Sequence, residues 1–296
     1  MGEGLIVRSL SGFYTVQEGD TLVECRARGR LKLDGIPPLV GDRVGYSESG
    51  GGKGMIENIF PRKNSFVRPS VANIDLFVIV LSSVPPVSEY TLVDRMIASA
   101  EKHGCQILLV ENKTDLAPDS HRFDLYAHAG FDLIRTSAAT REGIEDLLSR
   151  LSGVTAAFAG NSGVGKSSLL NAIDPNLFLS TGEISEKLGR GKHTTRHVQL
   201  FSLPGGGRLA DTPGFGSFDL QETEPEFYRE EVDLYFREFE PYRNQCRYLD
   251  CYHLKEPDCA VRRAVEVKTI SLSRYRSYCS LCEAAPRTPE HKIKHN

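Results

Sequence analysis

The segment that most constrains the fold is GNSGVGKSS, at positions 160–168. It fits the pattern G-x-x-x-x-G-K-[ST], in which glycines let the backbone turn tightly and point its N–H groups at phosphate oxygens. The apolar run TAAFA precedes it and the run SSLLNAI follows, so the motif stands between a predicted strand and a predicted helix. This context favours an α/β domain that binds the phosphates of a nucleotide over a chance glycine-rich turn.

Each residue type in this loop has its own expected task. Lys166 should neutralise the β- and γ-phosphates and support catalysis, and Ser167 should give its hydroxyl to Mg²⁺. The residues expected to contact the phosphates are Gly160, Asn161, Ser162, Gly163, Val164, Gly165, Lys166, Ser167 and Ser168.

A second phosphate element follows an apolar strand end as Asp-Thr-Pro-Gly, at 211–214. Asp211 is expected to hold Mg²⁺, and the Gly214 N–H to contact the γ-phosphate. An ordinary turn is the alternative, since these residues also favour turns. The polar stretch 182–198 between the two elements suits a switch loop, in which Thr194 or Thr195 would give the second Mg²⁺ hydroxyl. The sequence does not choose between the two threonines.

The sequence ENKTD, at 111–115, closes another predicted strand, where α/β sheets place ligand loops. The Asp115 carboxylate can accept two hydrogen bonds from guanine N1 and N2, and adenine offers no such pair of donors. Asn112 would tie the loop together, and the stem of Lys113 would pack over the base. Ser137 and Ala138, in a Thr-Ser-Ala sequence that also ends a strand, would complete the guanine site.

The order of these elements along the chain is unusual. The base loops come first, and the phosphate loop, the threonine pair and the D-x-P-G element follow. Joining the former ends of a guanine-nucleotide domain near 151–155 and cutting it after D-x-P-G produces this order and leaves the sheet intact. Permutation of this kind is tolerated because chain ends tend to lie close together.

With these motifs the chain resembles the circularly permuted GTPases of the ribosome small-subunit-dependent GTPase A (RsgA) family, over nearly its whole length. The resemblance implies an OB-fold that binds RNA at 1–65, a permuted GTPase domain at 66–222 and a helical zinc-binding domain at 223–296. It also implies GTP hydrolysis that the small ribosomal subunit stimulates, and a role in late maturation of that subunit.

The N-terminal segment shows five short alternating runs separated by glycine turns, which predict a small β-barrel of the OB or SH3-like kind. In ECRARGRLKL (24–33), alternation would place four basic side chains on one strand face, suited to a phosphate backbone or simply to solvent. These are Arg26, Arg28, Arg30 and Lys32. Further basic residues that could extend an RNA-binding surface include Arg274 and Arg276.

A cysteine and histidine cluster lies in the last quarter of the chain. Cys246, Cys251, His253 and Cys259 supply three thiolates and an imidazole, a set that fills the four positions of a structural zinc ion. The alternative is a scatter of reduced cysteines in a helical domain, but the family resemblance favours one zinc ion. We interpret Cys279 and Cys282, in a predicted helix, as packing or exposed thiols. The tail from 286 is expected to be disordered.

The catalytic residue is not the usual one. Phe215 follows Gly214 where Ras-type enzymes carry a glutamine that orients water, so intrinsic hydrolysis should be slow. The family resemblance points instead to His193, whose imidazole would position the water; a solvent-exposed loop histidine is the alternative. His197 falls in an apparent strand and ranks lower.

Bulk properties narrow the class of protein. The formal net charge of −3 argues against a general polyanion binder but allows local basic patches. No apolar run reaches the length of a membrane span and no secretion signal is evident, so we expect a cytoplasmic monomer. The leading interpretation is a GTP-hydrolysing assembly factor. Alternatives are a GTP-dependent clamp or sensor on RNA with incidental hydrolysis, and a P-loop ATPase or kinase with an accidental NKTD.

Overall fold

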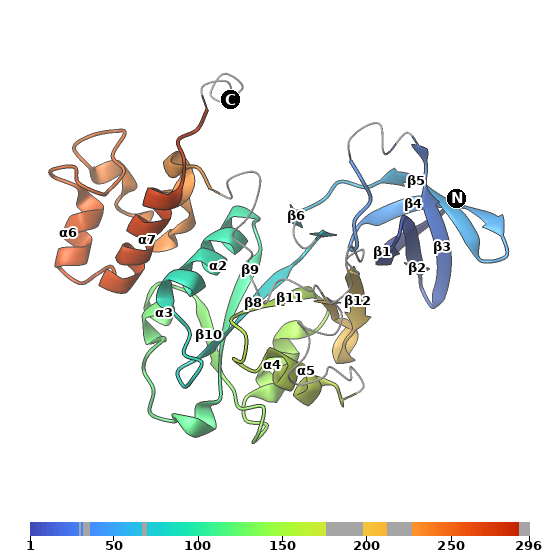
Figure 1. Ribbon diagram of the computed structural model, residues 1–296, viewed down its shortest axis with the longest axis horizontal. Helices are drawn as coiled ribbons and strands as arrows, with labels where there is room; N and C mark the ends of the chain where they lie inside the picture. The colour runs from blue at the N-terminus through green and yellow to red at the C-terminus, as the bar shows by residue number, and fades with distance from the viewer. Residues whose placement is uncertain (30, 32–35, 67–69, 176–197, 212–226, 290–296) are drawn as a thin grey trace.

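The structure is a computed structural model that describes residues 1–29, 31, 36–66, 70–175, 198–211 and 227–289. Three regions follow one another along the chain (Figure 1): a small barrel, a central sheet flanked by helices, and a helical C-terminal region. The barrel strands are β1 (Gly2–Leu10), β2 (Phe13–Glu18), β3 (Thr21–Ala27), β4 (Arg43–Gly50) and β5 (Lys53–Ile59).

The N-terminal strands form a closed barrel. β1 pairs antiparallel with both β2 and β4, β2 with β3, and β4 with β5, while β3 runs parallel to β5. This order is that of an OB-fold rather than an SH3-like barrel. Alternate residues such as Ile6, Val16, Val23, Val44 and Ile56 fill the interior, as the period-two pattern predicts.

One expectation for the barrel is wrong. The strand predicted to continue to Leu33 ends at Ala27, so Arg26 and Arg28 do not share an extended strand face. The chain turns because Leu31, whose N–H donates to the Arg28 carbonyl oxygen at 3.0 Å, folds back to pack on the barrel core. Arg30 and Lys32 lie outside the described residues.

The segment after the barrel is fixed to it by polar contacts. Arg62 makes two hydrogen bonds to the fully buried Asp42, at 2.7 and 2.8 Å. A short hairpin of β6 (Ser65–Phe66) and β7 (Val71–Ala72) follows, and Val71 bridges back to Val40. The described residues of the connection between barrel and sheet are therefore fixed to the barrel.

The central sheet runs in the order β10-β9-β8-β11-β13-β12. Its strands are parallel except for β12, which also pairs antiparallel with β1 and so joins the sheet to the barrel. Their bounds are β8 (Leu76–Ser82), β9 (Gln106–Asn112), β10 (Asp132–Arg135), β11 (Thr155–Ala159), β12 (Val198–Ser202) and β13 (Arg208–Asp211).

Helices cover both faces of this sheet (Figure 1). Along β8, Phe77, Ile79 and Leu81 share one buried cluster with residues of α2 (Tyr90–Lys102) and of the α3 (Asp124–His128) side. Val78 and Val80 face α4 (Ile144–Leu151) and α5 (Lys166–Ile173). Because alternate residues point to opposite faces, a strand buried on both sides is apolar throughout.

The C-terminal region packs against α2. It consists of short 3₁₀ turns η4 (Arg229–Tyr235), η5 (Arg237–Phe239) and η6 (Arg243–Gln245), then α6 (Ala260–Glu266) and α7 (Leu272–Ala284). Its aromatic core includes Phe236, Phe239 and Tyr278. Residues 290–296, most of the tail expected to be disordered, lie outside the described part.

A buried charge joins α7 to the central domain. The Arg274 guanidinium donates to Asp94 of α2 at 2.8 Å and to both carboxylate oxygens of Glu238 at 2.6 and 2.9 Å. Its side chain is 1% exposed. The expectation that Arg274 extends an RNA-binding surface is therefore wrong. The alternation of charge in the sequence could not show this, because its partner on α2 is 180 residues away.

Candidate functional site

The phosphate loop lies between β11 and α5, as predicted. Gly160, Gly163 and Gly165 have φ values of 139°, 80° and 98°, which residues with a side chain rarely adopt. A Cβ on Gly160 would lie 2.4 Å from the carbonyl oxygen of Val80. One on Gly165 would lie 2.3 Å from the Asn112 Nδ2 atom. The loop therefore requires glycine at these positions, both for its conformation and for close contact with neighbouring loops.

The Lys166 side chain bends back over this loop. Its Nζ donates to the carbonyl oxygens of Gly160 at 2.6 Å and Asn161 at 2.8 Å. Burial lowers the pKa of Lys166 to about 8, because within the described part of the chain no carboxylate offsets the loss of water around the ammonium. A bound phosphate would supply that missing negative charge. Ser167 and Ser168 lie half-buried in the first turn of α5, and Ser162 is exposed.

Asn112 ties three loops together. Its Nδ2 donates to the carbonyl oxygen of Val164 at 2.9 Å, which links the base loop to the phosphate loop. Its Oδ1 accepts from the N–H of Ala138 at 3.2 Å, which links it to the second base loop. This residue is 2% exposed, and its contacts agree with the tying role expected from the sequence.

The other base-loop residues are held by contacts with the loops around them. Lys113 has a left-handed φ of 66°, and its Nζ donates to the carbonyl oxygens of Gly163 at 2.7 Å and Pro85 at 3.3 Å. Its stem thereby spans from the base loop to the phosphate loop. The Ser137 hydroxyl donates to the Asp115 carboxylate at 2.7 Å. Asp115 is thus held by a second loop and keeps acceptor capacity for a base.

Several predicted residues lie outside the described part of the chain. They are His193, Thr194, Thr195, Gly214 and Phe215, together with the side chain of Asp211. The backbone of Asp211 ends β13, which runs parallel to β11 in the register Ala157↔Ala210. Adjacent parallel strands end at the same edge of a sheet, so Asp211 stands at the edge that carries the phosphate loop.

Sequence reasoning missed the segment after β8. Pro85 gives its carbonyl oxygen to Lys113, and the Pro86 ring lies where a Cβ on Gly163 would approach it to 2.9 Å. This segment thus forms one wall of the candidate nucleotide site. Its position at the carboxyl end of a buried parallel strand was the available signal.

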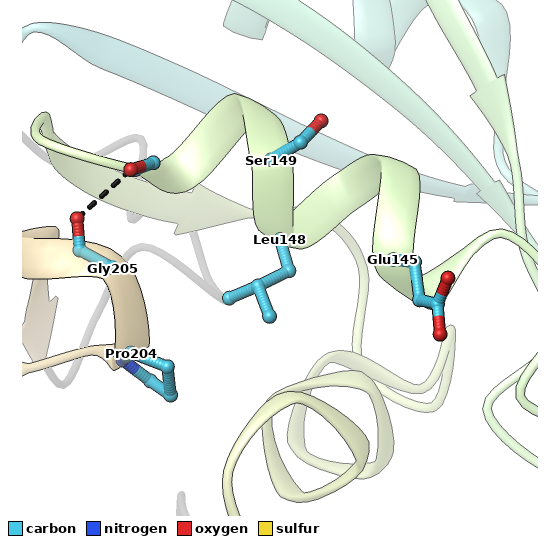
Figure 2. Close-up of a pocket in the computed structure, with 6 residues that line it drawn as sticks. Glu145, Leu148, Ser149, Pro204 and Gly205 are labelled. Atoms are coloured by element: carbon cyan, nitrogen blue, oxygen red, sulfur yellow. Dashed lines mark hydrogen bonds between the residues drawn. The ribbon is translucent and has the colours of Figure 1, made fainter.

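A separate hollow lies between α4 and the 3₁₀ turn η3 (Pro204–Gly206), with Glu145, Leu148 and Ser152 among its lining residues (Figure 2). The Ser152 hydroxyl donates to the carbonyl oxygen of Gly205 at 2.8 Å. This hollow is at the amino end of β11, the end opposite the phosphate loop. It therefore takes no part in the candidate nucleotide site.

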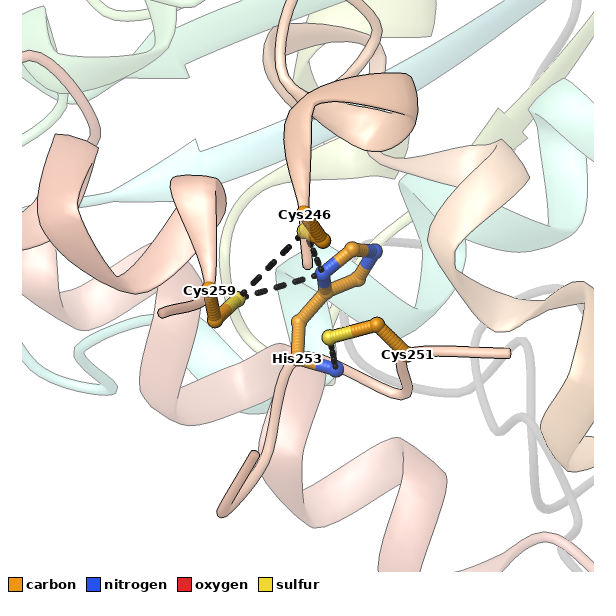
Figure 3. Close-up of side chains that lie close together, drawn as sticks. All are labelled: Cys246, Cys251, His253 and Cys259. Carbon is orange, nitrogen blue, oxygen red and sulfur yellow. Dashed lines mark hydrogen bonds between the residues drawn. The ribbon is translucent and has the colours of Figure 1, made fainter. Parts of the chain in front are cut away.

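The four predicted metal ligands converge (Figure 3). Their ligand atoms all lie within 4.8 Å of one another. The Sγ atoms of Cys246 and Cys259 are 3.8 Å apart, and the His253 Nδ1 lies 3.4 and 3.3 Å from them. Tetrahedral zinc with Zn–S bonds of about 2.3 Å and a Zn–N bond of about 2.0 Å separates its ligand atoms by about 3.5–3.8 Å. The donor set and its spacing fit zinc.

Helix α7 supports the metal loop from behind. The hydroxyls of Tyr275 and Tyr278 donate to the consecutive carbonyl oxygens of His253 and Tyr252, at 2.7 and 2.6 Å. His253 needs such support because it holds a left-handed φ of 56°. Cys282 is fully buried in the aromatic core and Cys279 is half-buried, and neither belongs to the metal cluster.

The described residues also bear on membrane association and on charge at the barrel surface. None of the described helices is long and apolar enough to cross a membrane. On the barrel, the guanidinium of Arg26 stacks 4.5 Å from the ring centroid of Phe13, and Arg28 forms an ion pair with Glu57. Arg26 is exposed and Phe13 is half-buried, and such a cation–aromatic pair is of the kind that can stack on a base.

Comparison with known proteins gives a consistent picture across the chain. The family model described as RsgA GTPase matches residues 59–221, and the model described as RsgA N-terminal domain matches 3–56. Proteins named small ribosomal subunit biogenesis GTPase RsgA match along their length. The one from Geobacillus sp. (strain WCH70) is 45% identical over 289 residues, 96% of this chain and 97% of its own. That from Moorella thermoacetica is 45% identical over 278 residues, 93% and 94% of the two chains.

Solved structures agree with these matches. The crystal structure of YjeQ from Thermotoga maritima superposes with a TM-score of 0.80 at 36% identity, covering 95% of this chain and 97% of that one. The structure of YloQ, described as a circularly permuted GTPase, superposes with a TM-score of 0.78 at 34% identity, covering 97% of each chain. The permuted order of the motifs thus has a counterpart in a solved structure, and the chain belongs to the RsgA family of circularly permuted GTPases.

Proposed function

We propose that this protein hydrolyses GTP and acts in the biogenesis of the small ribosomal subunit. The observation that carries the proposal is the contact of Asn112 with both the phosphate loop and the second base loop, which would make them one continuous nucleotide site. The names of its relatives, GTPases of small-subunit biogenesis, supply the biological context. The proposal places the protein in the cytoplasm, as a monomer that meets the subunit there.

The nucleotide would lie along the carboxyl edge of the sheet. Asp115 would accept hydrogen bonds from guanine N1 and N2, while the Ser137 hydroxyl donates a further hydrogen bond to the same carboxylate. At the other end, the N–H groups from Gly160 to Ser168 would surround the phosphates, and Lys166 would move its ammonium from the loop carbonyls to the phosphate oxygens.

Magnesium would be held at the phosphate end. Ser167 would give its hydroxyl, Asp211 its carboxylate and Thr194 or Thr195 a second hydroxyl. When bound, Mg²⁺ neutralises charge on the β- and γ-phosphates. The Gly214 N–H would contact the γ-phosphate from the D-x-P-G element.

Hydrolysis needs a group that positions the attacking water. Phe215 offers neither donor nor acceptor, so we propose a slow intrinsic rate that the small ribosomal subunit stimulates. His193 is the residue proposed to position the water. His193→Ala should abolish the stimulated rate and spare nucleotide binding, with His197→Ala as the matched control from the same stretch. An intact stimulated rate in the His193 variant would remove that role.

Binding to ribosomal RNA would use both ends of the chain. Arg26 and Arg28 on the barrel are the basic residues proposed to contact the RNA backbone, together with Arg30 and Lys32. The C-terminal region would be held together by one structural zinc ion on Cys246, Cys251, His253 and Cys259, and it would add a second contact.

The direct test compares GTP turnover by the pure chain alone, with small subunits and with large subunits. We expect stimulation by small subunits only, and competition by GDP but not by ADP. A different result would favour the alternative function, a GTP-dependent clamp on RNA, with which Phe215 is compatible. In that case small subunits would bind the chain in the presence of a non-hydrolysable GTP analogue but would leave the rate of GTP hydrolysis unchanged. No effect of either subunit on rate or binding would refute the proposal.

A further inference from the structure

A buried carboxylate lies directly beneath the base loop, where the nucleotide contacts described above do not use it. Glu111 is the last residue before Asn112 and is 2% exposed. Along β9 it continues the column of Ile107 and Leu109, which face α2 and belong to the same apolar cluster. Its side chain therefore points away from Asn112, into the layer behind the nucleotide site.

The partners of this carboxylate come from the ends of the two neighbouring strands. The Ser83 hydroxyl, just past β8, donates to Glu111 Oε1. Glu111 Oε2 lies 3.4 Å from the Nε of Arg135, the last residue of β10, and makes no hydrogen bond within the described residues. A buried carboxylate is costly to desolvate, so it persists only where such partners hold it.

A second layer of contacts closes the cluster. The Ser120 hydroxyl donates to the Ser83 hydroxyl at 2.8 Å, and Arg135 donates to the Ser120 carbonyl oxygen and, at 3.0 Å, to Asp124. Among the described residues, the ion pairs that lead from Glu111 are with Arg135 and, beyond it, between Arg135 and Asp124. Arg135 is shared between two carboxylates, so its position depends on both of them.

Three members of this cluster each stand two residues before a contact in the candidate guanine site. Glu111 precedes Lys113, which reaches the phosphate loop. Ser83 precedes Pro85, whose carbonyl oxygen accepts from Lys113. Arg135 precedes Ser137, which holds the Asp115 carboxylate. Glu111 therefore fixes the spacing of the three chain segments that together frame the base.

We propose that Glu111 is a positioning residue for guanine recognition, which holds the β8, β9 and β10 ends at the separation that lets Asp115 accept both guanine hydrogen bonds. This inference rests on the proposed role of the base loop. A glutamine at this position keeps the shape and an acceptor for Ser83, but its NH₂ group faces the Arg135 guanidinium without charge attraction. The β9 and β10 ends should separate slightly, and Asp115 should lose alignment.

The test compares affinities for GDP and inosine diphosphate, because hypoxanthine lacks the 2-amino donor that the second Asp115 hydrogen bond requires. In the wild-type chain GDP should bind more tightly, and Asp115→Asn should remove that preference. Glu111→Gln should reduce the ratio of the two affinities about three- to tenfold, as partial loss of one hydrogen bond implies. Ser83→Ala, which keeps the charge but removes a donor, should reduce the ratio less.

Asp132→Asn is the matched control, since Asp132 begins the same strand as Arg135 but is exposed, at 61% of its side chain. It should leave the ratio unchanged. The inference is overturned if Glu111→Gln lowers the affinities for GDP and inosine diphosphate by the same factor, or if it changes neither affinity. A purely structural role would act on the binding of both ligands equally. Should Glu111→Gln fail to fold, Ser83→Ala decides on the same criterion. Wild-type chain that binds ADP as well as GDP would instead refute the proposed function.

Discussion

Replacing Arg274 by methionine should release the C-terminal region from α2. Methionine keeps much of the apolar length of the side chain but removes the charge, and it leaves Asp94 and Glu238 without their cation. Asp94 is fully buried, and Glu238 is 10% exposed. The ring of Phe236, whose centroid lies 4.6 Å from the guanidinium, also loses a cation–π contact.

Removing one partner of a buried ion pair costs about 3–5 kcal/mol, because the remaining charge is left unpaired. At about 1.4 kcal/mol per factor of ten, the equilibrium for opening the α2–α7 interface should rise about a hundred- to several-thousandfold. Burial already raises the pKa of Asp94, and the Arg274 charge acts against that rise. Without Arg274 the pKa of Asp94 rises further.

This change in pKa predicts how the defect depends on pH. A carboxyl group whose pKa is raised on folding binds a proton more tightly in the folded state, so lowering the pH stabilises that state. The stability deficit of Arg274→Met relative to wild type should therefore shrink as the pH falls through the raised pKa of Asp94.

Amide hydrogen exchange on α7 is the suitable assay, because a multidomain chain need not unfold in a single step. Arg276→Met, on the exposed side of the same helix, is the matched control and should leave exchange unchanged. If protection on α7 fell less than tenfold in Arg274→Met, or if both variants behaved alike, the inference that this ion pair holds the two regions together would be wrong.

Three further outcomes follow from the two sites. GDP affinity should fall as the pH rises above about 8, because Lys166 of the free protein then loses its proton, whereas bound phosphate keeps the Lys166 ammonium charged, so that binding takes up a proton. Calorimetry in buffers of different ionisation enthalpy measures this proton uptake. Absence of the uptake would contradict the placement of Lys166. Gly165→Ala should abolish nucleotide binding, since its methyl would lie 2.3 Å from Asn112 Nδ2, whereas Gly206→Ala, at a φ of 79° with open space around it, should bind GDP normally. Cys259→Ser should reduce bound zinc from about one ion per chain to almost none in a colorimetric assay; a fully loaded variant would rule out the proposed ligand set.

The sequence predicts this fold well where one local pattern decides the structure. Alternation with glycine turns identifies the five barrel strands, and the strand–glycine loop–helix context identifies the phosphate loop. The same alternation misleads at Arg28, because the packing of Leu31 on the barrel core ends the strand. A five-residue helix such as α3 has too few turns for its period to show.

What the sequence could not predict are contacts between distant segments. Arg274 looks like any basic residue of a helix until its partner on α2 is known. Glu111 likewise looks like a polar strand end, although its carboxylate is buried against Ser83 and Arg135. Both are charges whose burial depends on tertiary structure, and charge in a sequence indicates exposure by default.

The permuted order of the strands has a consequence for synthesis on the ribosome. β8 is buried along its whole length, between β9 and β11, but β11 is translated some 70 residues after β8. At roughly 5–20 residues per second, one edge of this apolar strand waits for about 4–15 s before its permanent neighbour emerges. An unpermuted chain would make β11 before β8. The nascent protein must therefore shield an unpaired, aggregation-prone edge, by transient pairing or by a chaperone, before its own nucleotide site exists.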